Sequence, residues 1–181
     1  MVKEFWDFNE HINYTIVNIN GRNYKVIKKF KDYYYASLIL DYIYKYILLI
    51  CNYFKINYRN YSHYEQKLIN CFLEIHPNNY LLSEMQLGTP FNGLNKPKKV
   101  YTSTKENIGK DGKLRAKYRD VFLTLRNDSG KFNNEKIIMK LVIHEITHTM
   151  CNHVTWRNDD HGKDFQHAEK LITSAYNKVK N

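Results

Sequence analysis

The feature of this sequence that most constrains its fold is the segment from Tyr33 to Phe54, which is almost wholly apolar or aromatic. A run of about 18 or more such residues predicts either a membrane-spanning helix or a helix buried in a protein core. Asp41 and Lys45 stand four residues apart, which places an ion pair on one helical face, and the many tyrosine hydroxyls are unsuited to lipid. We therefore predict a buried helix and no membrane partner. A membrane-anchored protein with this segment as its span is the alternative.

Local patterns predict a hairpin before this helix and a second helix after it. Residues 12–30 alternate around Asn20-Gly21, which is a two-residue turn signal, and are expected to form the hairpin. Ser62 and Glu65 have the spacing of a capping box. The helix that they begin should end at His76-Pro77, because proline cannot continue it.

The middle of the chain is predicted to hold strands separated by turns. Residues 80–87, 100–104 and 118–126 have the composition of strands. Residues 88–97 contain two glycines and two prolines, and they predict a loop.

A second apolar helix is predicted from Asn134 onward, and it carries the motif His144-Glu145-Ile146-Thr147-His148. At about 100° per residue the two histidines lie about 40° apart, so both imidazoles can reach one cation with Glu145 beside them. Helical spacing places Ile137 in a buried sector and Thr147 in a narrow polar stripe. Buried histidines need a partner or a metal, and the geometry suits zinc-dependent hydrolysis. Two histidines hydrogen-bonded within the core are the alternative.

A catalytic zinc takes a third protein ligand. The metzincin pattern is excluded because Val154 stands where it requires a histidine, whereas Glu169, 21 residues after His148, suits a thermolysin-like spacing. His161 is the favoured candidate, because it stands where a new helix with an apolar stripe begins. The remaining candidates are an aspartate, His153 and His167.

The motif HEITH is followed by a spacer of 12 residues and then by HGKDF, which begins at His161. This arrangement resembles the active-site signature of the SprT-like and WLM metallopeptidases. The similarity covers residues 118–172. It implies that His144, His148 and His161 bind zinc, and that Glu145 is the general base of peptide-bond hydrolysis. A peptide substrate would then add to a sheet edge, for which the predicted strand nearest the motif helix is the candidate.

The resemblance also implies an α+β, zincin-like fold. It would have N-terminal helices, a small antiparallel sheet packed on the buried motif helix, and a C-terminal helix. The length of 181 residues predicts a single domain, residues 1–181. Within it, residues 1–90 would form a hairpin and helices of unassigned role, and residues 91–181 the catalytic core.

Charge suggests a second kind of partner. The chain carries a formal net charge of +10, and residues 96–119 hold nine basic and two acidic side chains. This segment would attract DNA or another polyanion. Several metallopeptidases of the resembled family act on proteins trapped on DNA, which suits such a segment.

The cysteines and the first residues of the sequence predict the cellular location of the protein. Three widely spaced cysteines do not indicate a disulfide framework, and acidic residues near Met1 do not suit a secretory signal. We expect an intracellular protein of the cytoplasm or nucleus, or of the host cell or virion if it comes from a large DNA virus with an AT-rich genome. A non-catalytic zinc protein, associated with nucleic acid or structural in a virion, is the rival to the enzyme.

Overall fold

The structure is a computed structural model that describes residues 13–87, 93–97, 119–151 and 161–180. Four α-helices and a five-stranded sheet make up these residues, which confirms the predicted α+β class. The elements in chain order are β1 Tyr14–Ile19, β2 Arg22–Ile27, α1 Tyr33–Asn57, the 3-10 turn η2 Tyr58–Asn60, α2 His63–Ile75, β3 Tyr80–Glu84, β4 Gly93–Pro97, β5 Arg119–Leu123, α3 Glu135–Met150 and α4 Lys163–Lys180.

The sheet is mixed, so the prediction of an antiparallel sheet is wrong. Its strand order is β1-β2-β3-β5-β4. The outer pairs, β1 with β2 and β5 with β4, are antiparallel, whereas β3 is parallel to both β2 and β5. Parallel neighbours need a long crossover connection, and α1 with α2 supplies it between β2 and β3.

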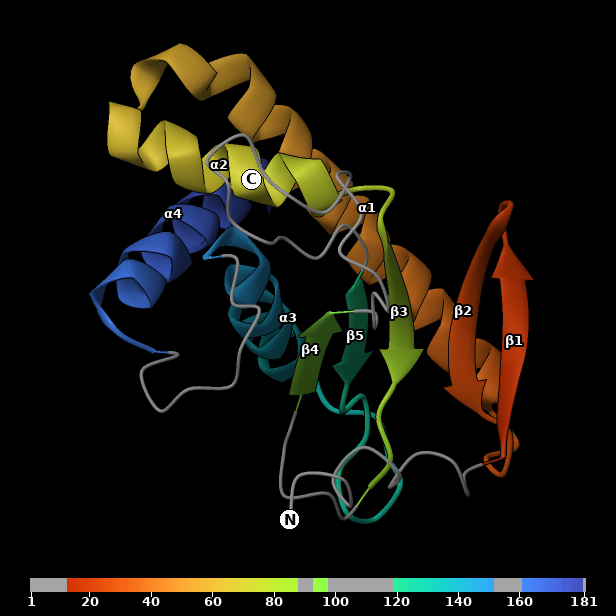
Figure 1. The fold of residues 1–181 in the computed structure, drawn as a ribbon. Helices are drawn as coiled ribbons and strands as arrows, with labels where there is room; N and C mark the ends of the chain where they lie inside the picture. Colours follow the sequence, from red (N-terminus) through yellow and green to blue (C-terminus); the bar gives the residue numbers. More distant parts are fainter. Residues whose placement is uncertain (1–12, 88–92, 98–118, 152–160, 181) are drawn as a thin grey trace.

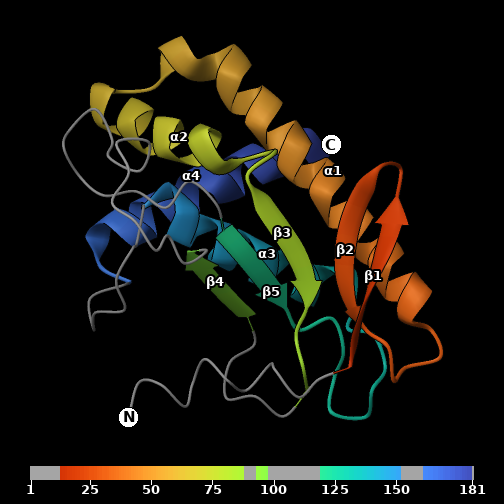
Figure 2. The same ribbon diagram turned by 45° about the vertical axis from the view of Figure 1, so that its right-hand side comes forward.

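The helices α1 and α3 lie on the same face of the sheet (Figures 1 and 2). Helix α1 contacts β1, β2 and β3, helix α3 contacts β4 and β5, and α4 packs on both helices. The apolar core fills the space between this helical layer and the sheet. Helix α3, which carries the motif, is therefore held between the sheet edge at β4 and the C-terminal helix.

Helix α1 is the core helix that the apolar segment predicts. Nine of its side chains are buried. Asp41 accepts a hydrogen bond from the Tyr24 hydroxyl at 2.9 Å and pairs with Lys45 at 2.8 Å. By length and composition, Tyr33–Asn60 is the one candidate membrane span in the described part of the chain. A core helix meets the same criteria, and 44% of the apolar window is buried inside the protein.

The predicted hairpin and capping box are both confirmed. Strands β1 and β2 pair across Asn20 and Gly21, whose φ angles of 52° and 82° are those that a tight hairpin turn requires. The Ser62 and Glu65 side chains cap each other's backbone N–H groups at the start of α2. Strand β4, in contrast, lies in the passage predicted to be a loop. The strand predicted at residues 100–104 lies outside the described residues.

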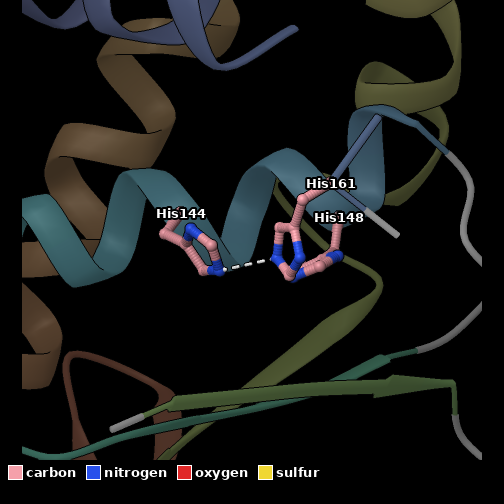
Figure 3. Close-up of side chains that lie close together, drawn as sticks. All are labelled: His144, His148 and His161. Carbon is pink, nitrogen blue, oxygen red and sulfur yellow. Dashed lines mark hydrogen bonds between the residues drawn. The ribbon is translucent and has the colours of Figure 1, made fainter. Parts of the chain in front are cut away.

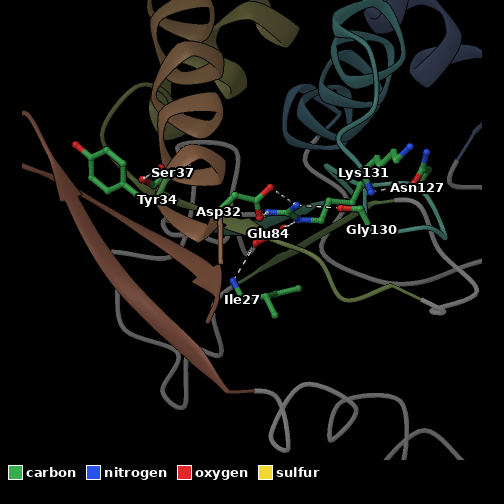
Figure 4. Close-up of polar contacts among 9 residues, drawn as sticks. Ile27, Asp32, Tyr34, Ser37, Glu84, Asn127, Gly130 and Lys131 are labelled. Atoms are coloured by element: carbon green, nitrogen blue, oxygen red, sulfur yellow. Dashed lines mark hydrogen bonds and ion pairs between the residues drawn. The ribbon is translucent and has the colours of Figure 1, made fainter. Parts of the chain in front are cut away.

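An ion network around the buried Arg126 joins strand β3 to Asp32, which precedes α1, and to the turn that precedes α3 (Figure 4). Arg126 is almost fully buried, and it binds Glu84 of β3 at 2.7 Å and Asp32 at 2.9 Å. It also donates to the Gly130 carbonyl at 3.0 Å, while Glu84 accepts a hydrogen bond from the Ile27 N–H at 2.9 Å. The network fixes the start of α1 against the turn that leads into α3.

Candidate metal centre

Helix α3 begins where the sequence predicts, with the Asn134 side chain accepting a hydrogen bond from the Ile137 N–H at 3.0 Å. Its burial differs from the prediction at two positions. Ile137 is exposed and Thr147 is buried, because spacing alone does not tell which side of a helix meets the sheet. The Thr147 hydroxyl donates to the Ile143 carbonyl at 2.7 Å, which satisfies it inside the core.

Three imidazoles converge at the C-terminal half of α3 (Figure 3). The ring centroids of His144, His148 and His161 are 5.0 to 5.1 Å apart, so the rings form a nearly equilateral triangle. One nitrogen of each ring lies within 4.8 Å of the others. His144 and His148 are one helical turn apart, whereas His161 comes from the start of the next helix.

The described donor set suits a metal ion. His144 Nε2 and His161 Nε2 are 3.2 Å apart. Two imidazole nitrogens at about 2.05 Å from a tetrahedral zinc would be about 3.3 Å apart, which agrees with this separation. These three histidines could therefore hold a metal ion, and neutral imidazoles suit zinc, copper, iron and nickel alike. The geometry does not select among these metals.

The aromatic residue of the HGKDF sequence packs against all three imidazole rings. Phe165, in the first turn of α4, is buried. Its ring centroid lies 5.1, 4.8 and 4.6 Å from those of His144, His148 and His161. Because one ring contacts all three imidazoles, Phe165 restricts their orientations. The apolar stripe of α4 predicts that this residue is buried, but does not predict the contact.

The start of α4 is also attached to α2. The Tyr64 hydroxyl donates to Asp164 Oδ1 at 2.6 Å, and His167 pairs with Glu65 at 3.2 Å. These contacts position the turn that carries His161. They also give His167, one of the alternative third ligands, a carboxylate partner outside the triangle.

Glu169, the second candidate for third ligand, lies beside the triangle rather than in it. Its Oε1 is 3.5 Å from His144 Nδ1, the ring nitrogen opposite the one that faces His161. Burial and the nearby His161 ring lower the pKa of His144, and the Glu169 carboxylate opposes that shift. A carboxylate in this place orients a histidine toward a metal by accepting its Nδ1–H.

Glu145 lies under the edge strand of the sheet. It is buried, and burial raises the pKa of its carboxyl to about 8. A Cβ atom at Gly93 would lie 2.8 Å from Glu145 Cδ and even closer to Oε1. Only glycine therefore allows β4 to approach this carboxyl group so closely.

Asn95 of β4 ties that strand to α3. Its amide donates to the Glu145 main-chain carbonyl and, at 2.8 Å, to the Thr149 hydroxyl. Arg119 of β5 donates in turn to Asn95 Oδ1 at 3.2 Å. Sequence reasoning missed Asn95, because nothing in a passage rich in glycine and proline marks an asparagine as buried.

The predicted polyanion-facing segment, residues 96–119, lies mostly outside the described residues. Its last residue, Arg119, is only 1% exposed, and burial lowers the pKa of its guanidinium to about 10. Arg119 therefore belongs to the core and not to a basic surface. His153 also lies outside the described residues, as do the aspartates at 159 and 160.

No protein-family model matches the chain, and neither a curated protein nor a solved structure matches it. The resemblance to the SprT-like and WLM metallopeptidases therefore rests on the sequence of residues 118–172 alone.

Proposed function

We propose that the protein is a zinc-dependent metallopeptidase. The observation that carries this proposal is the convergence of one ring nitrogen each from His144, His148 and His161 within 4.8 Å of one another. Two of these histidines stand on the helix that also bears Glu145. Among the described residues the group has three protein ligands, which is the number that a catalytic zinc site takes, whereas closed structural sites take four. Zinc bound there would activate a water molecule and polarise a carbonyl oxygen.

In this proposal Glu145 moves the proton. Its carboxylate accepts a proton from the attacking water at Oε1 or Oε2 and returns it to the leaving amine. The group must be ionised for the first step. A cation held by the neighbouring histidines favours that form, against the burial that raises the pKa of the carboxyl.

The substrate would be an extended peptide lying along β4. Of the described strands, β4 ends the sheet and also packs on α3. The sequence-based expectation placed the substrate edge at residues 118–126, and this is wrong because β5 lies between β3 and β4. A peptide that pairs with the free side of β4 would pass next to Glu145.

Zinc content and peptide cleavage test this proposal together. Purified wild-type protein should contain about one zinc per chain by elemental analysis, and His161→Ala should lose it. Glu145→Gln should keep the zinc and lose cleavage of an unstructured protein such as casein. Zinc loss in Glu169→Ala with retention in His161→Ala would contradict the ligand set. Zinc retention without cleavage by the wild type on any substrate would favour a structural zinc protein.

Association with DNA is a separate part of the proposal and rests on the charge of residues 96–119. Binding to duplex DNA should weaken steeply with salt if this segment contacts phosphates. Arg119→Gln should not change that salt dependence, because its side chain is buried.

A further inference from the structure

The solvent face of α1 carries an apolar stripe at heptad spacing. Tyr35, Tyr42, Leu49 and Ile56 recur at every seventh position, and all four are exposed. The intervening positions of the stripe are Leu38, Lys45 and Asn52, which are also exposed. The first set occupies the a positions of three consecutive heptads and the second set occupies the d positions. This is the pattern by which two helices pack along each other.

This stripe is unusual for a solvent-facing surface. Of the nine large hydrophobic residues exposed in the described part of the chain, six belong to α1. Ile56, at 83%, is the most exposed of the nine. The helix runs along the outer side of the fold (Figure 2). Large apolar side chains gathered on one exposed helix face in this way are the kind of surface that binds a partner.

The stripe is also close to neutral, although the chain carries a net charge of +10. Its one cation, Lys45, is paired with Asp41 at 2.8 Å. Two strongly basic molecules would therefore meet at this face with little repulsion between them.

We infer that this stripe binds a second copy of the chain, with the two α1 helices antiparallel. In that orientation an a position of one helix faces a d position of the other. Leu38 then packs on Leu49 of the second copy, and Tyr42 receives Lys45 on its ring. Tyr35 faces Asn52 of the second copy, and the Asn52 side-chain amide can form a hydrogen bond with the Tyr35 hydroxyl. Each pair occurs twice, as an interface with two-fold symmetry requires.

Other arrangements of the same stripe are less favourable. A parallel pair would place Lys45 against Lys45 at the middle of the contact and Asn52 against Asn52 near its end. An antiparallel pair shifted by one heptad would place Lys45 against Leu49. The pairing of Leu38 with Leu49 is the one in which both polar residues of the stripe face a tyrosine.

A groove beside the stripe could take up side chains of the second copy. It has a volume of about 370 Å³ and is lined by Tyr35, Leu38 and Tyr42 of α1 and by Ile138 and Met139 of α3. In the antiparallel arrangement Ile56 of the second copy extends toward this end of α1. The groove is also lined by Asn133 and Glu135, so it offers polar as well as apolar contacts to a side chain of the second copy.

Sedimentation equilibrium tests whether the dimer forms. The mass should rise from 21.8 kDa toward twice that value over about 5 to 500 µM protein. Leu49→Lys should raise the dissociation constant at least about tenfold. Ile16→Lys, at an exposed apolar residue of β1 outside the stripe, is the matched control and should dimerise like the wild type.

Disulfide trapping tests the orientation, in a background with Cys71→Ser and Cys151→Ser. Leu38→Cys and Leu49→Cys should cross-link when mixed, and neither should cross-link alone. Cross-linking of each variant with itself would overturn the antiparallel pairing. A mass that stays at one chain throughout would overturn the dimer. Binding of the monomer to anionic lipid vesicles, lost in Leu49→Lys, would assign the stripe to a membrane instead.

Discussion

At the scale of single residues, the candidate site depends on close approaches that a larger side chain would prevent. Gly93 is the clearest case, because its Cα lies against the Glu145 carboxyl group. An edge strand that carried any side chain at this position would have to move away from α3 or displace Glu145. The residue thus links the position of the strand to the position of the proposed base.

Gly93→Ala should reduce peptide cleavage by at least about tenfold while zinc binding remains. The added Cβ would overlap Glu145, and overpacking of this kind costs about 1 to 3 kcal/mol of stability. Gly21→Ala is the matched control. It strains a backbone with φ of 82° but has no atom within 4 Å of the new Cβ, so it should lower stability without lowering activity. Equal activity losses in both variants would show that Gly93 does not act through Glu145.

Glu169→Gln should weaken zinc binding by about tenfold without abolishing it, because an amide orients His144 less strongly than a carboxylate does. Competition with a chromophoric chelator would measure the change. Glu135→Gln offers a matched control, since Glu135 pairs with Lys180 at 3.5 Å at the opposite end of α3 from the triangle. An effect as large as that of His161→Ala would instead make Glu169 a ligand.

At the scale of elements, the sequence predicted those helices and turns that are stabilised by residues close to one another in the chain. The hairpin, the capping box of α2, the long core helix and the start of α3 at Asn134 were all predictable, because turn residues, caps and apolar periodicity lie within a few positions of each other. Strand β4 was not predictable. It is five residues long, it contains both Gly93 and Pro97, and it is a strand because it pairs with β5.

The same distinction applies to the candidate site. The three histidines were predictable as a group, because two of them share one face of the motif helix and the third stands where the next helix begins. The contributions of Asn95, Phe165 and Glu169 depend on packing between elements far apart in the sequence. No single-sequence pattern encodes that packing, which is why the sequence left Glu169 open as an alternative third ligand beside the favoured His161.

Asn95→Ala should destabilise the protein by about 2 to 4 kcal/mol, because it removes a donor to the buried Thr149 hydroxyl and an acceptor for the buried Arg119 guanidinium. Urea unfolding would measure the loss. Asn70→Ala removes one exposed side-chain hydrogen bond, which the Asn70 amide donates to the Tyr58 hydroxyl, and it should change stability by less than about 0.5 kcal/mol. Similar effects of the two variants would show that β4 is not held to α3 by Asn95.

At the scale of the whole molecule, the packing between elements determines how the protein responds to acid. His76 lies fully inside the core, between the rings of Phe72 and Tyr80 at 4.5 and 4.3 Å. Neither of its ring nitrogens has a hydrogen-bond partner among the described residues. Burial, with smaller contributions from Arg119 and Arg22, lowers the pKa of His76 from 6.5 to about 3.

The unfolded chain therefore binds a proton at this histidine below about pH 6.5, whereas the folded chain does not until about pH 3. Between these values the unfolded state holds more protons, so the free energy of unfolding should fall by up to about 1.4 kcal/mol per pH unit on acidification. His76→Phe keeps the ring contacts and removes the titration, so urea unfolding at pH 7, 6, 5 and 4 should show a shallower decline. His63→Phe, at an exposed position of α2, should retain the wild-type decline. If both variants lose stability with acid as steeply as the wild type, protonation of His76 does not cause the acid dependence of the free energy of unfolding.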